Sequence, residues 1–151
     1  MKSLFLLTFA LVPAALSAQP QQCVLQEAAL NGAYVVTTTG TAGSPVWAPF
    51  TGPVAVMARS VFDGLGNFQI TTVTIVAANP PLNVTPPVVI NGTYKLNRDC
   101  TGSLTLNFSP APNGHYNLVA SPDGRQITMI SSDQGDVLTA TATRLDRGGR
   151  D

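Results

Sequence analysis

The chain has 151 residues, and eight basic residues balance eight acidic ones, so its formal net charge is zero. Charged residues make up 11% of the sequence, which is less than half of the roughly 25% that is usual in soluble domains. A neutral chain lacks the basic surface that nucleic-acid binding requires, and its apolar content of 44% is too high for a disordered charged tail. The composition therefore predicts one folded domain with an apolar core and no nucleic-acid partner.

Residues 1–18 have the pattern of a secretory signal peptide. Lys2 provides a positive start, residues 4–11 are almost continuously apolar, and small residues follow Pro13. The apolar run is too short to cross a hydrocarbon core of roughly 30 Å. We therefore expect an exported protein, extracellular or, in a Gram-negative bacterium, periplasmic, with no membrane insertion after the signal is cleaved.

Cys23 and Cys100 are the only cysteines, and both follow the expected signal peptide. An even number of cysteines in an oxidising compartment most simply forms a disulfide. A thiolate metal site would need further ligands, and the sequence has one histidine and no acidic cluster near the cysteines. We therefore expect a Cys23–Cys100 disulfide, no metal site and no cofactor.

The rest of the chain is a succession of short β-branched and aromatic runs, each closed by a turn sequence. One or two helical turns are expected first, over residues 25–30, ended by Asn31-Gly32. The eight expected strands are residues 34–39, 54–62, 68–77, 88–96, 103–108, 115–120, 125–131 and 137–145. The proline-rich residues 79–87 are interpreted as a stiff surface loop, because strands of the same character flank them.

Several of these runs alternate between apolar and polar residues. Leu104, Leu106 and Phe108 share one face of their run, and Leu138, Ala140 and Ala142 share one face of the last run. Alternation is typical of antiparallel sheets with one buried and one wetted face.

Sequential strands joined by short turns predict an all-β domain over residues 24–146, followed by a polar tail over residues 147–151. Asp63-Gly64 and Asp123-Gly124 are tight-turn sequences, so neighbouring strands should pair as hairpins. The favoured architecture is a single eight-stranded up-and-down barrel, and a two-sheet β-sandwich is the alternative.

Residue types that carry catalysis are scarce. His115 opens an expected strand without a nucleophile motif beside it. Glu27 is the only glutamate, and the aspartates between the expected strands fall in turns, where they normally bond their own backbone. The sequence identifies no catalytic residue and favours binding over enzyme activity.

Candidate ligand-binding residues are the amphipathic rings and the cations that fall inside strands. They are Tyr34, Trp47, Arg59, Phe62, Tyr94, Tyr116 and Arg144. The rings either line a pocket or fill a solid barrel, and solvent is the commoner place for a strand cation. Trp47 lies in a proline-flanked loop, where it either forms a lid or recognition patch or packs onto the barrel end.

Three asparagines begin N-glycosylation acceptor sequences, which have a meaning only if the source is eukaryotic. They are Asn83, Asn91 and Asn107.

Four fragments carry a family likeness. They are residues 30–34 (Leu-Asn-Gly-Ala-Tyr), 62–67 (Phe-Asp-Gly-Leu-Gly-Asn), 92–94 (Gly-Thr-Tyr) and 99–103 (Asp-Cys-Thr-Gly-Ser). Their order resembles a group of small secreted microbial proteins with calycin-type barrels, of the allene oxide cyclase barrel-like and lipocalin kind. The Asp-Cys-Thr-Gly turn with an N-terminal partner cysteine is the most specific element. The resemblance implies a calycin-like barrel and a secreted protein, without implying one activity.

We expect a secreted barrel that binds a small apolar or amphipathic ligand. One alternative is an isomerase or cyclase of the allene oxide cyclase-like kind, which would act by positioning its substrate. Another is a structural or adhesive secreted protein with a filled barrel. A cavity of ligand size would separate the first two from the third.

Overall fold

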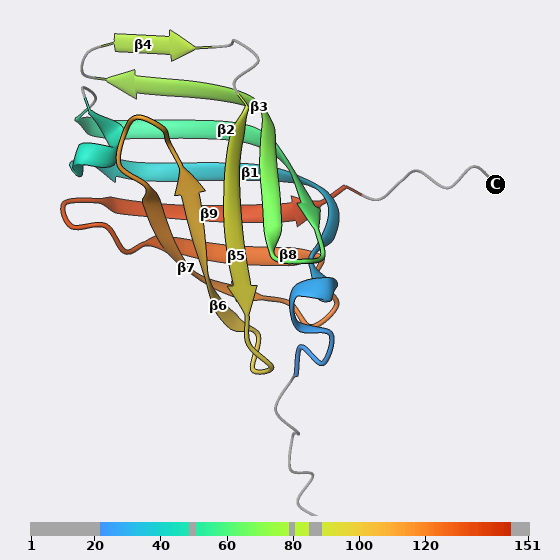
Figure 1. The fold of residues 1–151 in the computed structure, drawn as a ribbon. Coiled ribbons are helices and arrows are strands. Elements are labelled where there is room, and N and C mark those ends of the chain that lie inside the picture. The colour runs from blue at the N-terminus through green and yellow to red at the C-terminus, as the bar shows by residue number, and fades with distance from the viewer. Residues whose placement is uncertain (1–21, 49–50, 79–80, 85–88, 146–151) are drawn as a thin grey trace, which may run out of the picture.

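The structure is a computed structural model that describes residues 22–48, 51–78, 81–84 and 89–145. Within these residues, eight antiparallel strands close into a barrel, and a ninth strand lies outside it (Figure 1). Two short 3-10 helical turns accompany the strands. The expected signal peptide and polar tail lie outside the described residues.

All eight expected strands are confirmed. The barrel strands are β1 (Asn31–Ala42), β2 (Gly52–Asp63), β3 (Asn67–Ala78), β5 (Ile90–Leu96), β6 (Thr101–Asn107), β7 (Gly114–Ala120), β8 (Gln126–Ser131) and β9 (Val137–Arg144). Each barrel strand pairs with the next, and β1 also pairs with β9, which closes the ring. The sheet is therefore a closed up-and-down barrel, and the β-sandwich alternative is excluded.

The interpretation of the proline-rich segment as a loop was wrong for four of its residues, because β4 (Pro81–Val84) forms a strand. The first part of β3 pairs with β5, and its last part, from Ile75 to Ala78, pairs with β4 instead. Pro81 is the first residue of β4, a position where a strand tolerates a missing N–H. β4 thus continues the sheet beyond the point where β5 begins (Figure 1).

A register shift in β3 keeps its apolar side chains inside the barrel. The pairing of β2 with β3 slips between Arg59 and Ser60, which leaves Thr71 as the extra residue of a bulge. Phe68 is buried before the bulge and Val73 is buried after it, although the two are five positions apart. Without the bulge, strict alternation would place these two residues on opposite faces.

One end of the barrel is closed by the segment that precedes β1. The 3-10 turn η1 (Gln26–Ala29) covers this end, and Leu30 behind it is fully buried. Cys23 forms the expected disulfide with Cys100, with their Cα atoms 5.0 Å apart. The disulfide therefore fastens η1 to the turn before β6.

Four aromatic rings pack together beneath η1. Phe62 is at the centre of this aromatic cluster, with its ring 5.0 Å from Tyr34 and 5.1 Å from both Phe68 and Tyr94. A Cβ at position 92 would overlap the ring of Phe68, so only glycine lets that ring lie across β5. The aromatic cluster forms the floor of the remaining barrel interior.

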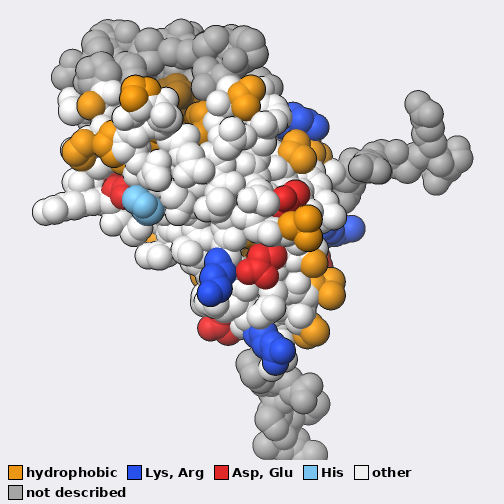
Figure 2. Space-filling model, in the orientation of Figure 1, with side chains coloured by type: hydrophobic (Ala, Val, Ile, Leu, Met, Phe, Trp, Pro, Cys, Tyr) orange, Lys and Arg blue, Asp and Glu red, His pale blue; other side chains and the backbone are white. Residues whose placement is uncertain are grey.

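Alternate residues of the strands form an outer surface rich in threonine. The side chains of Thr37 on β1 and Thr141 on β9 bond each other across the seam at 2.9 Å. Figure 2 shows that charged side chains are sparse on the face it presents. None of the described helical segments has the length and apolar character that a membrane-spanning helix needs.

Candidate functional site

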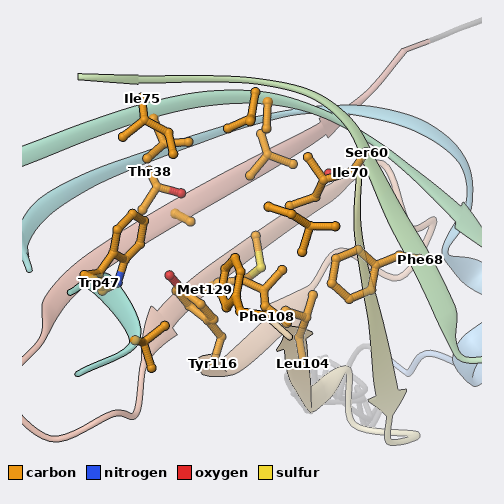
Figure 3. A pocket seen from close by; sticks show the side chains of 18 of the residues that line it. Thr38, Trp47, Ser60, Phe68, Ile70, Ile75, Leu104, Phe108, Tyr116 and Met129 are labelled. Atoms are coloured by element: carbon orange, nitrogen blue, oxygen red, sulfur yellow. The ribbon is translucent and has the colours of Figure 1, made fainter. Parts of the chain in front are cut away.

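A cavity of about 210 Å³ lies inside the barrel, beyond the aromatic cluster as seen from η1 (Figure 3). All eight barrel strands contribute to its wall, together with the 3-10 turn η2 (Pro45–Trp47). The described lining residues are Val36, Thr38, Val46, Trp47, Ala48, Val56, Ala58, Ser60, Phe68, Ile70, Val73, Ile75, Ile90, Leu104, Leu106, Phe108, Tyr116, Met129 and Ala140. Their side chains are mostly apolar, so the cavity suits an apolar occupant.

Small side chains leave the space open. Ala58 on β2 and Ala140 on β9 are buried and point inward. Other strands place larger side chains, such as Leu104 and Met129, at their inward positions. Phe68 forms one boundary, because its ring belongs both to the aromatic cluster and to the cavity wall. The cavity is therefore the part of the barrel that neither the cluster nor larger side chains fill.

Three hydroxyl groups border this apolar space. They belong to Thr38, Ser60 and Tyr116, whose residues are only 7%, 2% and 6% exposed. None of the three side chains has a hydrogen-bond partner among the described residues. Figure 3 shows the oxygen atoms of Thr38 and Tyr116 pointing into the cavity.

The phenol of Tyr116 stays protonated over the physiological range. Burial raises the pKa of Tyr116 well above its usual value, and the negative charges of Asp136 and Asp133 raise it further. Tyr116 therefore presents an O–H group to the cavity and not a phenolate.

Asp136 holds η2 against the barrel. Its carboxylate accepts hydrogen bonds from the backbone N–H groups of Gly43 and Ser44 and from the Ser44 hydroxyl, each at 2.9 Å. Trp47, at the end of η2, is half-buried and packs with residues of the barrel wall. Of the two expectations for Trp47, the structure shows packing onto the barrel end, where the ring also lines the cavity.

Of the expected ligand-binding residues, Trp47 and Tyr116 come together at the cavity. Tyr34, Phe62 and Tyr94 lie in the aromatic cluster instead. The hydroxyl groups of Tyr34 and Tyr94 are not available to the cavity, because each bonds the backbone of this chain.

Both of those tyrosine hydroxyls donate to backbone carbonyls. Tyr34 bonds Gly124, and Tyr94 bonds the carbonyls of Glu27 and Leu30 at 3.0 and 3.1 Å. Burial raises the pKa of Tyr94 to about 12, and burial raises the pKa of Tyr34 as well. These two side chains anchor the closed end of the barrel.

The two expected cations lie outside the cavity wall. Arg59 is exposed on the outer face of β2 and donates to the Thr71 hydroxyl at 3.2 Å. Arg144 pairs with Tyr34 in the β1–β9 register, at the end that η1 covers, and its positive charge partly offsets the rise in the pKa of Tyr34.

Sequence reasoning missed Thr38 and Ser60 as cavity residues. Both follow the alternation of their strands: Thr38 lies four residues after the buried Tyr34, and Ser60 lies two residues before the buried Phe62. Counting inward positions from those rings would have found them, although threonine and serine in a strand usually mark the wetted face.

His115 lies on the outside of β7. Its Nδ1 atom is 2.8 Å from Asp133, and its backbone N–H donates to the same carboxylate at 2.8 Å. Within the described residues, no group of three or more histidine, cysteine, aspartate or glutamate side chains is placed to hold a metal ion.

Two of the expected glycosylation asparagines, Asn91 and Asn107, are exposed and face each other in the β5–β6 pairing. The side chain of Asn83 lies outside the described residues.

The fold and the site together define a closed, eight-stranded antiparallel barrel with one disulfide and an internal apolar cavity. This architecture is consistent with a calycin-like barrel. No protein-family model, no curated protein and no solved structure matches the chain.

Proposed function

We propose that this protein is a secreted barrel that binds a small apolar molecule in its cavity. The observation that carries the proposal is the 210 Å³ space, to which every barrel strand contributes and whose lining side chains are mostly apolar. An apolar cavity of roughly 150 Å³ is known to hold benzene, so this one admits a somewhat larger molecule.

Export is supported by two features. The Cys23–Cys100 disulfide suits an oxidising compartment, and residues 1–18 have the composition of a cleaved signal. The likeness of four sequence fragments to secreted allene oxide cyclase-like and lipocalin-like barrels is in keeping with both.

The cavity also supports the alternative of a cyclase or isomerase, because two hydroxyl groups point into it and could orient a substrate there. Recovery of a bound molecule unchanged favours the binding protein, and its conversion to an isomer favours the enzyme. The cavity speaks against a barrel that is filled and purely structural.

The affinity for a small probe can be estimated. A molecule that buries about 200 Å² of apolar surface gains about 5 kcal/mol, which corresponds to a Kd on the order of 0.1 mM. Such binding is best followed by NMR, where the amide signals of cavity residues report occupancy directly.

The test is a titration of the full chain with α-methylstyrene, with a matched pair of variants. Ala58→Leu adds an isobutyl side chain inside the cavity, and Ala55→Leu makes the same change on the exposed face of β2. We expect saturable binding by the wild type and Ala55→Leu, and at least tenfold weaker binding by folded Ala58→Leu. No saturable binding, or equal binding by both variants, would refute the proposal.

A further inference from the structure

Of the three cavity hydroxyl groups without a described partner, two lie on the same side of the cavity, those of Thr38 and Tyr116. Thr38 and Tyr116 are both more than nine-tenths buried, and neither side chain bonds another described residue. Within the described residues, every side-chain nitrogen or oxygen that is completely enclosed has a hydrogen-bond partner. Since the oxygens of Thr38 and Tyr116 have none, they are not completely enclosed and border the open space of the cavity. A hydroxyl that leaves water without a new hydrogen bond is costly, which makes an occupant of the cavity its natural partner.

The strand pairing places the two hydroxyls close together along the barrel. Thr38 pairs with Ala140 on β9, and Ala140 pairs with Met129 on β8. Met129 pairs with Leu118 on β7, which is two residues, or one inward position, from Tyr116. Figure 3 shows Thr38, Tyr116 and Trp47 on one side of the cavity, and Phe68 on the other.

The opposite part of the cavity is mostly apolar. Ile70 and Leu104 border it together with the ring of Phe68, and Ser60, beside Ile70, adds a single hydroxyl there (Figure 3). An occupant therefore meets two hydroxyl groups at one end and a mostly hydrocarbon wall at the other.

The described lining residues carry no charge at neutral pH. An ionised occupant would lose its hydration without meeting a countercharge, which costs several kcal/mol or more. The carboxylates of Asp133 and Asp136 lie close enough to Tyr116 to raise its pKa, so an anion would also be repelled. The electrostatics select against ions, and most strongly against anions.

We propose that the occupant is an uncharged molecule with a hydrocarbon body and one carbonyl or hydroxyl oxygen, which the hydroxyls of Thr38 and Tyr116 bind. The hydrocarbon body lies against Phe68. This inference rests on the proposed binding function and adds the chemical class of the ligand.

The test compares two probes of the same shape, acetophenone and α-methylstyrene, which differ by C=O in place of C=CH₂. Each probe is titrated into the wild type, Tyr116→Phe and Thr38→Val. We expect the affinity ratio of acetophenone to α-methylstyrene to fall about three- to tenfold in each variant, because a hydrogen bond to the carbonyl is lost.

Matched controls remove the same groups elsewhere. Tyr94→Phe removes a buried hydroxyl that bonds the backbone, and Thr39→Val removes an exposed hydroxyl one residue from Thr38. Both should keep the wild-type ratio. Benzoate, the anionic relative of acetophenone, should bind at least tenfold more weakly than acetophenone.

The outcomes separate the two proposals. If both probes bind but the ratio is the same in wild type, Tyr116→Phe and Thr38→Val, the inference about the oxygen is wrong and the binding function stands. Benzoate binding as tight as that of acetophenone overturns the requirement for a neutral ligand. If neither neutral probe binds, the proposed function fails and the inference fails with it.

Discussion

The three tyrosines of this chain are all buried, yet their hydroxyl groups have different environments. Those of Tyr34 and Tyr94 donate to backbone carbonyls at the closed end of the barrel. That of Tyr116 faces the cavity without a described partner. The same residue type therefore anchors the closed barrel end at two positions and borders the cavity at the third.

This difference predicts effects of different size on the free energy of unfolding. Tyr94→Phe removes the hydroxyl that donates to the carbonyls of Glu27 and Leu30 and should lower the free energy of unfolding by about 1–2 kcal/mol. Tyr116→Phe removes only an unbonded hydroxyl and should change it by less than about 0.5 kcal/mol, or raise it. Urea denaturation monitored by circular dichroism measures both. Equal losses for the two variants would contradict this assignment.

The three tyrosines also determine how the stability of the folded barrel changes at high pH. Burial raises the pKa of all three above the value of 10.0 for an accessible phenol. The unfolded chain therefore releases these protons at lower pH than the folded barrel does. The resulting stability is complete below pH 10 and is lost as the pH rises from about 10 towards the folded values. The urea midpoint should be level up to pH 9 and then fall. Tyr116→Phe should flatten that fall, and a midpoint that stays level to pH 12 would be inconsistent with the raised pKa values.

At the scale of elements, η1 depends on the disulfide. Besides the bond itself, the backbone N–H of Cys23 donates to the Arg98 carbonyl at 2.8 Å, so the segment before β1 is attached to the turn after β5. The cysteines are 77 residues apart, and a loop of that length gives the bond a large effect on the unfolded chain.

Reduction should therefore destabilise the protein strongly. The chain-entropy model gives a loss of about 4–5 kcal/mol as an upper value for this loop. Urea denaturation with and without reductant measures it, and the Cys23→Ser/Cys100→Ser double variant is the control, because its midpoint should not respond to reductant. A wild-type midpoint that is unchanged by complete reduction would rule out a stabilising role.

The second element-scale prediction concerns η2 and Asp136. Asp136→Ala removes the acceptor of three hydrogen bonds from Gly43 and Ser44 and should loosen the turn that carries Trp47. Because Trp47 is the only tryptophan, its fluorescence reports this directly as greater quenching by acrylamide. Asp133→Ala is the matched control, since that carboxylate bonds His115 and not η2. Quenching that is equal in wild type and Asp136→Ala would show that η2 holds its place by apolar packing alone.

Strands such as β6 and β9 were predictable because apolar and polar residues alternate strictly along their own sequence. This pattern can be recognised without knowing which strands lie beside them. β4 was not predictable, because its pairing depends on how far β3 extends beyond β5. The positions of Phe68 and Val73 on one face were also hidden, since the bulge at Thr71 breaks the period of two.

The cavity could be predicted only in part. Tyr116 and Trp47 were candidates as amphipathic rings, but Tyr34 and Tyr94 carried the same sequence signal and proved to close the barrel end. Whether a barrel is hollow depends on the combined volumes of side chains from all its strands. The small residue Ala140 makes room only because of what faces it from distant parts of the chain.

At the scale of the whole molecule, the low charge and the closed sheet belong together. A net charge of zero provides little electrostatic repulsion between copies, and threonine-rich strands pair readily. Closure of the ring by β1 and β9 leaves the barrel strands without a free edge along that seam. The closed sheet thus limits association between copies of the protein, which other proteins limit through net charge.

The seam between β1 and β9 has a consequence for how the molecule is made. Thr37 and Thr141 meet across it although 104 positions separate them. During synthesis β9 emerges last, so the ring stays open while every earlier strand is already available for pairing. Folding that waits for such a distant contact is slow for a domain of this size, and the waiting chain exposes the edges that the finished barrel hides. The time between the emergence of β1 and the arrival of β9 is therefore when this protein is most exposed to aggregation.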